Sequence, residues 1–282
     1  MYSVTLGFKA FDAHELLCHF VAQQAGLYKK HGLQVGLEDI TFIPESDLPR
    51  HWFQASCGAA LASAVKGIPQ RVVFVGVDKP MFWIFARQDI KRLDDLGKKK
   101  LATFPSFAPP HQLANIVLAR AGLTGPDAAK LHAARDDTAR FGLLRSGHVD
   151  AAVISSAMAP ARLIGLGFNL LAFLGDEFRM PTTGLGVDQA HVESEPELTD
   201  LIVAIHKKSL ALMHDDIPLV SRVLQEVFEV AAGYADLTAR QYVACFTADG
   251  TTTGEIAQAA IDAMARSMDL DVPPDWREVY LF

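Results

Sequence analysis

The chain has few cysteines and no long uninterrupted apolar run. Cys18, Cys57 and Cys245 lie far apart in apolar surroundings, so the sequence indicates neither a disulfide framework nor a zinc site with paired cysteines. The longest apolar stretch, residues 163–175, is interrupted by Asn169 and is shorter than the roughly 20 residues that cross a bilayer. We therefore expect no membrane-spanning helix.

Clusters of basic residues are also missing. The net charge is −7 and the lysines and arginines are scattered, which disfavours nucleic acid as a partner. The sequence contains no tandem repeat and no low-complexity tract. With 282 residues, of which 50% are hydrophobic and 21% are charged, the chain has the composition of a soluble globular protein and the length for two lobes.

The first twenty residues do not have the pattern of a secretory signal. Such a signal needs an uninterrupted apolar core and a small-residue cleavage site, whereas Lys9, Asp12, His14 and Glu15 fall within this segment. The chain as given is therefore predicted to carry no export signal.

Short β-type runs alternate with helical segments over the first two thirds of the chain. Residues 4–8, 33–40 and 71–77 have the pattern of strands, and residues 15–31 and 56–65 that of helices. This alternation is typical of an α/β protein. From Glu195 onward the pattern is helical, with an apolar stripe, and we expect these helices to form a coat.

Four segments carry a resemblance to a known family. Residues 20–35 read Phe-Val-Ala-Gln-Gln-Ala-Gly-Leu-Tyr-Lys-Lys-His-Gly-Leu-Gln-Val, which is similar to the opening of nitrate-, taurine- and sulfonate-binding proteins. Residues 62–77, 93–102 and 143–152 add further matches in the expected order. The chain thus resembles the type II periplasmic solute-binding proteins of ABC importers (NMT1/THI5-like, SsuA/TauA-like).

The resemblance implies a two-lobed α/β fold in which each lobe is a mixed sheet flanked by helices. One lobe would comprise residues 1–86 and 181–282, the other residues 87–180, joined by two hinge strands near Arg87 and Arg179. It also implies a periplasmic monomer without a cofactor or metal, which captures a small polar organic molecule between the lobes and passes it to a membrane permease. Sulfonates, carboxylates and pyrimidines or other heterocycles are the ligand classes expected.

Ligands of open α/β sheets bind beyond the carboxyl ends of the strands, where helix N-termini present unpaired amides. This rule selects loop residues as candidate ligand contacts. They are Phe11, Asp12, His14, Ser56, Cys57, Phe82, Ser106, Phe107, Arg135, Ser155, Ser156 and Glu177.

Each of these residues also has a purely structural interpretation. Ser56 and Ser155 stand at predicted helix starts and have the chemistry of N-caps, and Asp12 has that of a solvated turn residue. His14 has the four-residue spacing to Cys18 that metal ligands use, although a core position for the thiol is favoured. Cys57, at a helix N-terminus, is either a nucleophile or a small buried thiol.

Two other functions stay open. A cytoplasmic enzyme on the same scaffold, thiamine-pyrimidine synthase-like or desulfinase-like, is suggested by the missing export signal and by His14, Cys57 and Arg135 in loops. Neither the cysteine-rich motif of the yeast synthase nor the Arg-x-Gly-Gly motif of the desulfinase is found, which disfavours those two activities. A ligand-sensing module is the third possibility. If Asp12 and Glu177 both line the site, their charges disfavour a simple inorganic anion such as nitrate.

Overall fold

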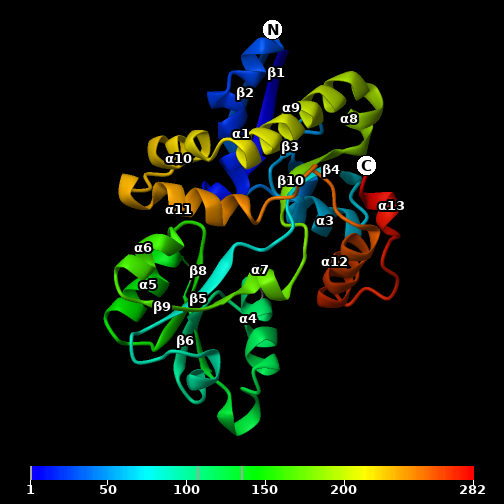
Figure 1. Ribbon diagram of the computed structural model, residues 1–282. Helices are drawn as coiled ribbons and strands as arrows, with labels where there is room; N and C mark the ends of the chain where they lie inside the picture. Colours follow the sequence, from blue (N-terminus) through cyan, green and yellow to red (C-terminus); the bar gives the residue numbers. More distant parts are fainter. Residues whose placement is uncertain (1, 107, 135) are drawn as a thin grey trace. The chain divides into compact units, whose positions relative to one another are not determined.

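The computed structural model describes residues 2–106, 108–134 and 136–282, and the chain divides into two compact units (Figure 1). The first unit is Met1–Lys79 with Arg179–Phe282, and the second is Pro80–Phe178. The first predicted boundary, after residue 86, differs from this division. Residues 82–86 form a strand that is hydrogen-bonded on both sides to strands of the second unit, so they belong to that unit.

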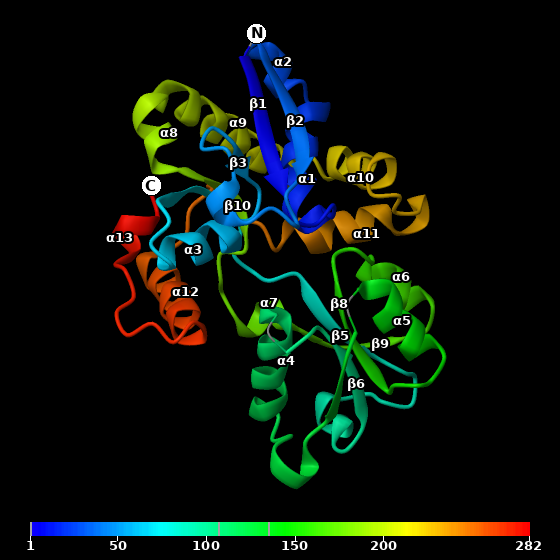
Figure 2. The same ribbon diagram turned by 180° about the vertical axis from the view of Figure 1, so that it is seen from behind.

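The first unit is built on a five-stranded sheet of order β2-β1-β3-β10-β4. The strand β10 runs antiparallel to its neighbours, whereas β1, β2 and β3 are parallel. Helices α1 and α9 lie over one face of this sheet and α3 with α12 over the other, as Figures 1 and 2 show from opposite sides. The strands are β1 (Tyr2–Phe8), β2 (Leu33–Asp39), β3 (Phe53–Gln54), β4 (Gln70–Val77) and β10 (Thr183–Asp188).

Helices make up most of the rest of the first unit, and the predicted helical coat of the last third is present. The predicted helix over residues 15–31 is instead two helices, because Gly26 adopts a left-handed φ of 67° that ends the first one. The helices are α1 (Ala13–Gln24), α2 (Leu27–Lys30), α3 (Cys57–Val65), α8 (Gln189–Ser194), α9 (Pro196–Asp215), α10 (Ile217–Glu226), α11 (Ala232–Val243), α12 (Gly254–Ser267) and α13 (Trp276–Val279), with a 3₁₀ turn at Glu45–Asp47.

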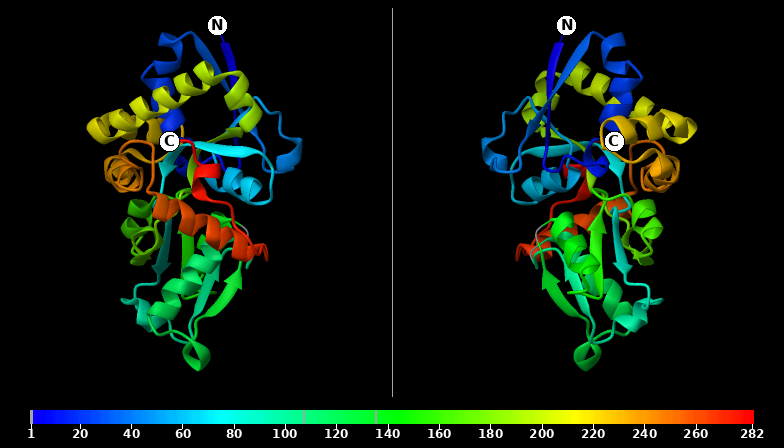
Figure 3. Two further views of the ribbon diagram at one scale, coloured as in Figure 1. Left: turned by 90° about the vertical axis from the view of Figure 1, so that its right-hand side faces the viewer. Right: turned by 90° about the vertical axis from the view of Figure 1, so that its left-hand side faces the viewer.

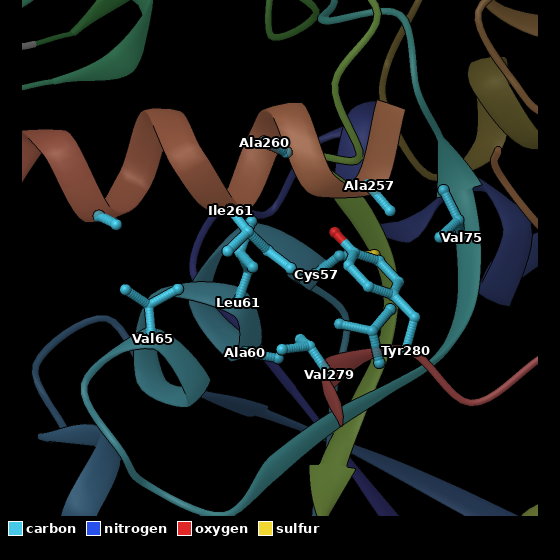
Figure 4. Close-up of a cluster of buried hydrophobic side chains, with 12 residues drawn as sticks. Cys57, Ala60, Leu61, Val65, Val75, Ala257, Ala260, Ile261, Val279 and Tyr280 are labelled. Atoms are coloured by element: carbon cyan, nitrogen blue, oxygen red, sulfur yellow. The ribbon is translucent and has the colours of Figure 1, made fainter. Parts of the chain in front are cut away.

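Two glycines of β10 let helix α3 pack close against the sheet. A Cβ atom at Gly184 would lie 2.5 Å from the Cys57 sulfur, and one at Gly186 would lie 2.3 Å from the Ala60 Cβ. Only glycine fits at these positions. The resulting contact buries a cluster in which Cys57 and Leu61 pack with Ile261 of α12 (Figure 4).

The second unit has its own five-stranded sheet of order β7-β6-β8-β5-β9. The strands are β5 (Phe82–Ala86), β6 (Lys100–Thr103), β7 (Lys130–Ala133), β8 (Ala151–Ser155) and β9 (Asn169–Phe173). The helices are α4 (Pro109–Arg120), α5 (Asp137–Arg145), α6 (Pro160–Gly165) and α7 (Leu174–Glu177), with 3₁₀ turns at Leu93–Leu96 and Gly125–Asp127. Helix α4 lies on one side of this sheet and α5 with α6 on the other (Figure 3).

The core of the second unit lies between α4 and the sheet. It joins apolar side chains of β5, β6 and β8, such as Ile84, Leu101 and Val153, to Val117 and Leu118 of α4. Two mixed sheets, each flanked by helices, confirm the predicted α/β class. None of the helices described is both long enough and apolar enough to cross a membrane.

Candidate functional site

The carboxyl ends of β1, β3 and β4 and the start of β10 meet along one edge of the first sheet. Four segments follow or precede these strand ends, residues 9–12, 55–56, 78–79 and 179–182. We call this set of segments the first-unit edge. It is the kind of position at which open α/β sheets bind ligands.

Asp12 starts helix α1. Its Oδ1 accepts a hydrogen bond from the Glu15 amide at 3.0 Å, and its side chain is buried. Asp12 is thus a helix N-cap, and the interpretation as a solvated turn residue is wrong. Phe11, directly before it, has 54% of its surface exposed.

Glu15 holds the loop between β1 and α1. Its Oε2 accepts hydrogen bonds from the amides of Lys9 at 2.8 Å and Ala10 at 3.2 Å. Burial, with a further contribution from the charge of Asp12, raises the pKa of Glu15 to about 7. This carboxyl group therefore changes its charge close to neutral pH while it organises the loop.

His14 reaches across the edge to the segment before β10. Its Nε2 lies 2.8 Å from the Thr182 hydroxyl, which donates to the carbonyl of Val77 at 3.4 Å. Burial lowers the pKa of His14 to about 4, so the ring is neutral at pH 7. The direction of the His14–Thr182 hydrogen bond follows from which imidazole nitrogen carries the proton.

Ser56 and Cys57 are neighbours with different environments. The Ser56 hydroxyl accepts from the Ala59 amide at 3.3 Å and caps α3, as one of its two interpretations predicted. The Cys57 thiol donates to the Phe74 carbonyl at 3.4 Å in the apolar cluster of Figure 4. Burial raises the pKa of this thiol far above its usual range. The structure therefore contradicts a nucleophilic Cys57 and places its side chain away from the first-unit edge.

An ion pair joins two further segments of the first-unit edge, residues 78–79 and 179–182. The Arg179 guanidinium binds the buried carboxylate of Asp78, with Nε at 3.1 Å from Oδ2. The Asp78 carbonyl accepts the amide of Met180 at 2.7 Å. The segments that follow β4 and precede β10 are thus tied together.

The second unit has an equivalent edge, formed by the ends of β6, β7, β8 and β9 and the start of β5. We call it the second-unit edge. Ser155, the last residue of β8, donates its amide at 2.7 Å and its hydroxyl at 2.6 Å to the Asp137 carboxylate. It does not cap a helix at 156, because α6 begins only at Pro160. Ser156, next to it, is also buried.

Arg140 is the central residue of the second-unit edge, and its side chain is fully buried. Its Nε donates to the Val153 carbonyl and its Nη1 to the Ala134 carbonyl, both at 2.8 Å. Its Nη2 lies 2.9 Å from the Asp137 carboxylate. The guanidinium also stacks 3.5 Å above the Phe104 ring. One buried cation thus connects strand β8 with the segments that follow β6 and β7.

The remaining candidates are distributed over the second unit. The Phe82 ring packs edge-on against Phe104 with centroids 5.4 Å apart, and Ser106 is exposed in the loop before α4. Glu177 forms an ion pair of 2.9 Å with Arg120. Phe107 and Arg135 lie outside the described residues.

The sequence did not single out two residues of these edges, Thr182 and Arg140. Thr182 carries no motif, and its pairing with His14 spans 168 positions. Asp137 and Arg140 had a usable signal, the i,i+3 spacing of opposite charges at a helix start. Among the described residues, no group of three or more acidic, histidine or cysteine side chains is arranged to hold a metal ion.

Solved structures of the same fold are numerous, at low sequence identity. The aliphatic sulphonate binding protein SsuA of Escherichia coli superimposes with a TM-score of 0.79 at 15% identity, covering 99% of this chain and 97% of that one. The SsuA of Xanthomonas axonopodis pv. citri, bound to MOPS, has a TM-score of 0.72 at 14% identity, with 99% and 98% covered. The desulfurization enzyme DSZB has a TM-score of 0.74 at 14% identity, with 98% and 96% covered.

These structures share the fold of type II periplasmic binding proteins, which this chain adopts. No curated protein matches the sequence significantly. The family model described as NMT1/THI5 like matches residues 14–216, which is most of the chain. This protein therefore belongs to the NMT1/THI5-like family.

Proposed function

We propose that this protein is the solute-binding component of an ABC importer and that it binds a small polar organic molecule at the first-unit edge. The observation that carries the proposal is the grouping of exposed Phe11 with the neutral His14–Thr182 pair beyond the strand ends. The family match and the sulfonate-binding proteins of the same fold support it. Periplasmic action is part of the proposal.

The chemistry of this edge suits a ligand that is polar without being a bare anion. The neutral imidazole of His14 and the hydroxyls of Thr182 and Ser56 lie on neighbouring segments and are polar without carrying a charge. Asp12 contributes negative charge, which disfavours a small inorganic anion. Sulfonates, carboxylates and pyrimidines or other heterocycles with an organic body are the ligand classes proposed. That such a molecule is held between two lobes stays a prediction.

A thermal-shift screen tests this function. Purified protein is heated with nitrate, alkyl and aryl sulfonates, carboxylates, pyrimidines and flavins. A ligand at a hundredfold its dissociation constant adds about 2.7 kcal/mol to the free energy of unfolding, which is a readily measured shift. We expect a shift with a member of the organic classes and no shift with nitrate. Failure of all these compounds to shift the transition would contradict the proposal.

An enzyme on the same scaffold is the second candidate, favoured by the contact of a neutral imidazole with a hydroxyl at His14 and Thr182. A thiol mechanism has no support from the described residues, because burial raises the pKa of Cys18 to about 12 and that of Cys57 further still. Mass spectrometry of the ligand after incubation separates the two functions. Unchanged ligand supports binding alone, and a consumed ligand supports catalysis.

A further inference from the structure

Phe11 is an exposed aromatic residue in the middle of the first-unit edge. More than half of its surface, 54%, is exposed although it lies between a strand and a helix that are both well packed. Three residues further on is His14, which contacts Thr182. Phe11 and His14 thus belong to one loop and the helix turn that follows it, and Thr182 belongs to the segment that His14 contacts.

Three other aromatic rings surround Phe11. Its ring centroid lies 5.7 Å from that of Phe8, 5.8 Å from that of Phe20 and 6.0 Å from that of Phe228. The first two contacts are edge-on, with interplanar angles of 73° and 65°. Such contacts fix the orientation of a ring while leaving much of Phe11 exposed.

Hydrogen bonds and an ion pair hold the backbone of the loop that carries Phe11. Glu15 accepts the amides of Lys9 and Ala10. The Thr41 hydroxyl donates to the Lys9 carbonyl at 2.9 Å, and Lys9 pairs with Glu45 at 2.7 Å. A ligand that packs on Phe11 therefore does not have to order this loop, and a preorganised surface of this kind favours binding.

The first-unit edge has few cations that could attract a charged ligand. Of its three cations, Lys9 is paired with Glu45 and Arg179 with Asp78. Lys79 is the third. Two of the three cations of this edge are thus already paired with a carboxylate, whereas more than half of the surface of Phe11 is exposed.

We propose that the ligand carries an aromatic ring, which packs on the exposed face of Phe11 while a polar substituent reaches the His14–Thr182 pair. This proposal rests on the proposed function and narrows its ligand class. The ring of the ligand replaces water over an apolar surface that the fold already holds in place. Aromatic sulfonates, aromatic carboxylates and planar heterocycles are the compounds that satisfy both requirements.

Two matched pairs of probes test the inference by titration calorimetry. Benzenesulfonate is compared with hexanesulfonate, and benzoate with heptanoate, so that charge and carbon number stay constant while the ring is removed. We expect the aromatic member of a pair to bind at least about tenfold more tightly. We expect Phe11→Leu to weaken aromatic binding by about the same factor and to leave aliphatic binding unchanged.

Phe11→Trp and Phe282→Leu complete the experiment. The tryptophan variant retains a stacking surface and keeps aromatic affinity, whereas Phe282→Leu removes an exposed ring near the other end of β4 and changes neither affinity. Equal or tighter binding of the aliphatic probes, or aromatic binding unaffected by Phe11→Leu, overturns the inference and leaves the proposed function in place. Absence of binding by all four probes overturns the inference and also removes sulfonates and carboxylates from the proposed function.

Discussion

The two sheet edges are organised by different chemistry. At the second-unit edge, one fully buried arginine binds two backbone carbonyls and the carboxylate of Asp137. At the first-unit edge, the loops are held by helix caps, by backbone amides bound to Glu15 and by the neutral pair of His14 with Thr182. The second edge thus depends on one fully buried guanidinium. The first depends on helix caps, on groups whose charge depends on pH and on the Arg179–Asp78 ion pair, whose guanidinium is half exposed.

From this difference we infer that the two edges have different roles. A buried guanidinium that binds two carbonyls and a carboxylate is a fixed support, because removing it leaves these partners unpaired in a dry interior. The first-unit edge has the exposed ring of Phe11 and, in the first turn of α1, the neutral imidazole of His14, and we assign ligand binding to this edge. We therefore expect stability to respond most to the second edge and ligand affinity to respond most to the first.

Replacing Arg140 should have the largest effect on stability. Arg140→Met keeps much of the side-chain volume but leaves Asp137 without its cation and two carbonyls without a donor. We expect a loss of about 3–5 kcal/mol in the free energy of unfolding, as for one partner of a buried ion pair. Urea unfolding followed by tryptophan fluorescence measures this loss.

Arg120→Met is the matched control in the same unit. Arg120 pairs with Glu177 while 55% of its side chain is exposed, so the same chemical change should cost less than about 1 kcal/mol. Equal losses for the two variants would contradict the claim that burial makes Arg140 the support of this edge.

The first unit should lose stability as the pH falls. Burial lowers the pKa of His14 to about 4, of His19 to about 3 and of His206 to about 4. Below their usual pKa of about 6.5 these histidines take up protons only on unfolding, so each contributes stability that is lost as pH falls toward 4. Glu15, whose pKa is raised to about 7, has the opposite sign and gains stability as pH falls from 7 to 4.5.

Three histidines against one carboxyl group leave a net uptake of two protons on unfolding, a loss of at most about 2.7 kcal/mol between pH 6 and pH 5. Urea unfolding at both pH values measures it. His206→Gln should reduce the loss by about 1.4 kcal/mol, because it removes one of the three histidines. A transition that is insensitive to pH would show that these rings are not buried in solution.

The smallest effect is expected for the thiols. Cys18, Cys57 and Cys245 are all buried, so a disulfide reagent such as DTNB should modify none of them in the folded protein and all of them in urea. Rapid modification of Cys57 in the native state, with loss of ligand binding, would restore the nucleophile interpretation and favour the enzyme.

Local sequence rules predicted the fold class and the positions of several loop residues, whose contact with a ligand stays a prediction. The alternation of strands and helices gave the α/β class, and positions after strand ends identified Phe11, His14 and Ser56. A cap such as Ser56 is predictable because it depends on the few residues that follow it. The weak strands β3 and β7 were not predicted, because β3 has two residues and β7 is largely exposed.

Two side chains have environments that are set by distant parts of the chain. Cys57 has the sequence context of a reactive thiol, but Gly184 and Gly186, more than a hundred positions later, bring β10 against its helix and bury it. Arg140 has the sequence context of a solvated helix residue, yet carbonyls of two other segments enclose it. Local patterns do not contain this information.

The most direct test of the central claim is calorimetric titration of Thr182→Val with whichever ligand gives the largest thermal shift. The substitution preserves the shape of the side chain and removes the hydroxyl that binds His14. If the first-unit edge binds the ligand, the affinity falls by about tenfold, as for the loss of one hydrogen bond in a binding site. An unchanged affinity in a folded variant would contradict the account and place the ligand elsewhere.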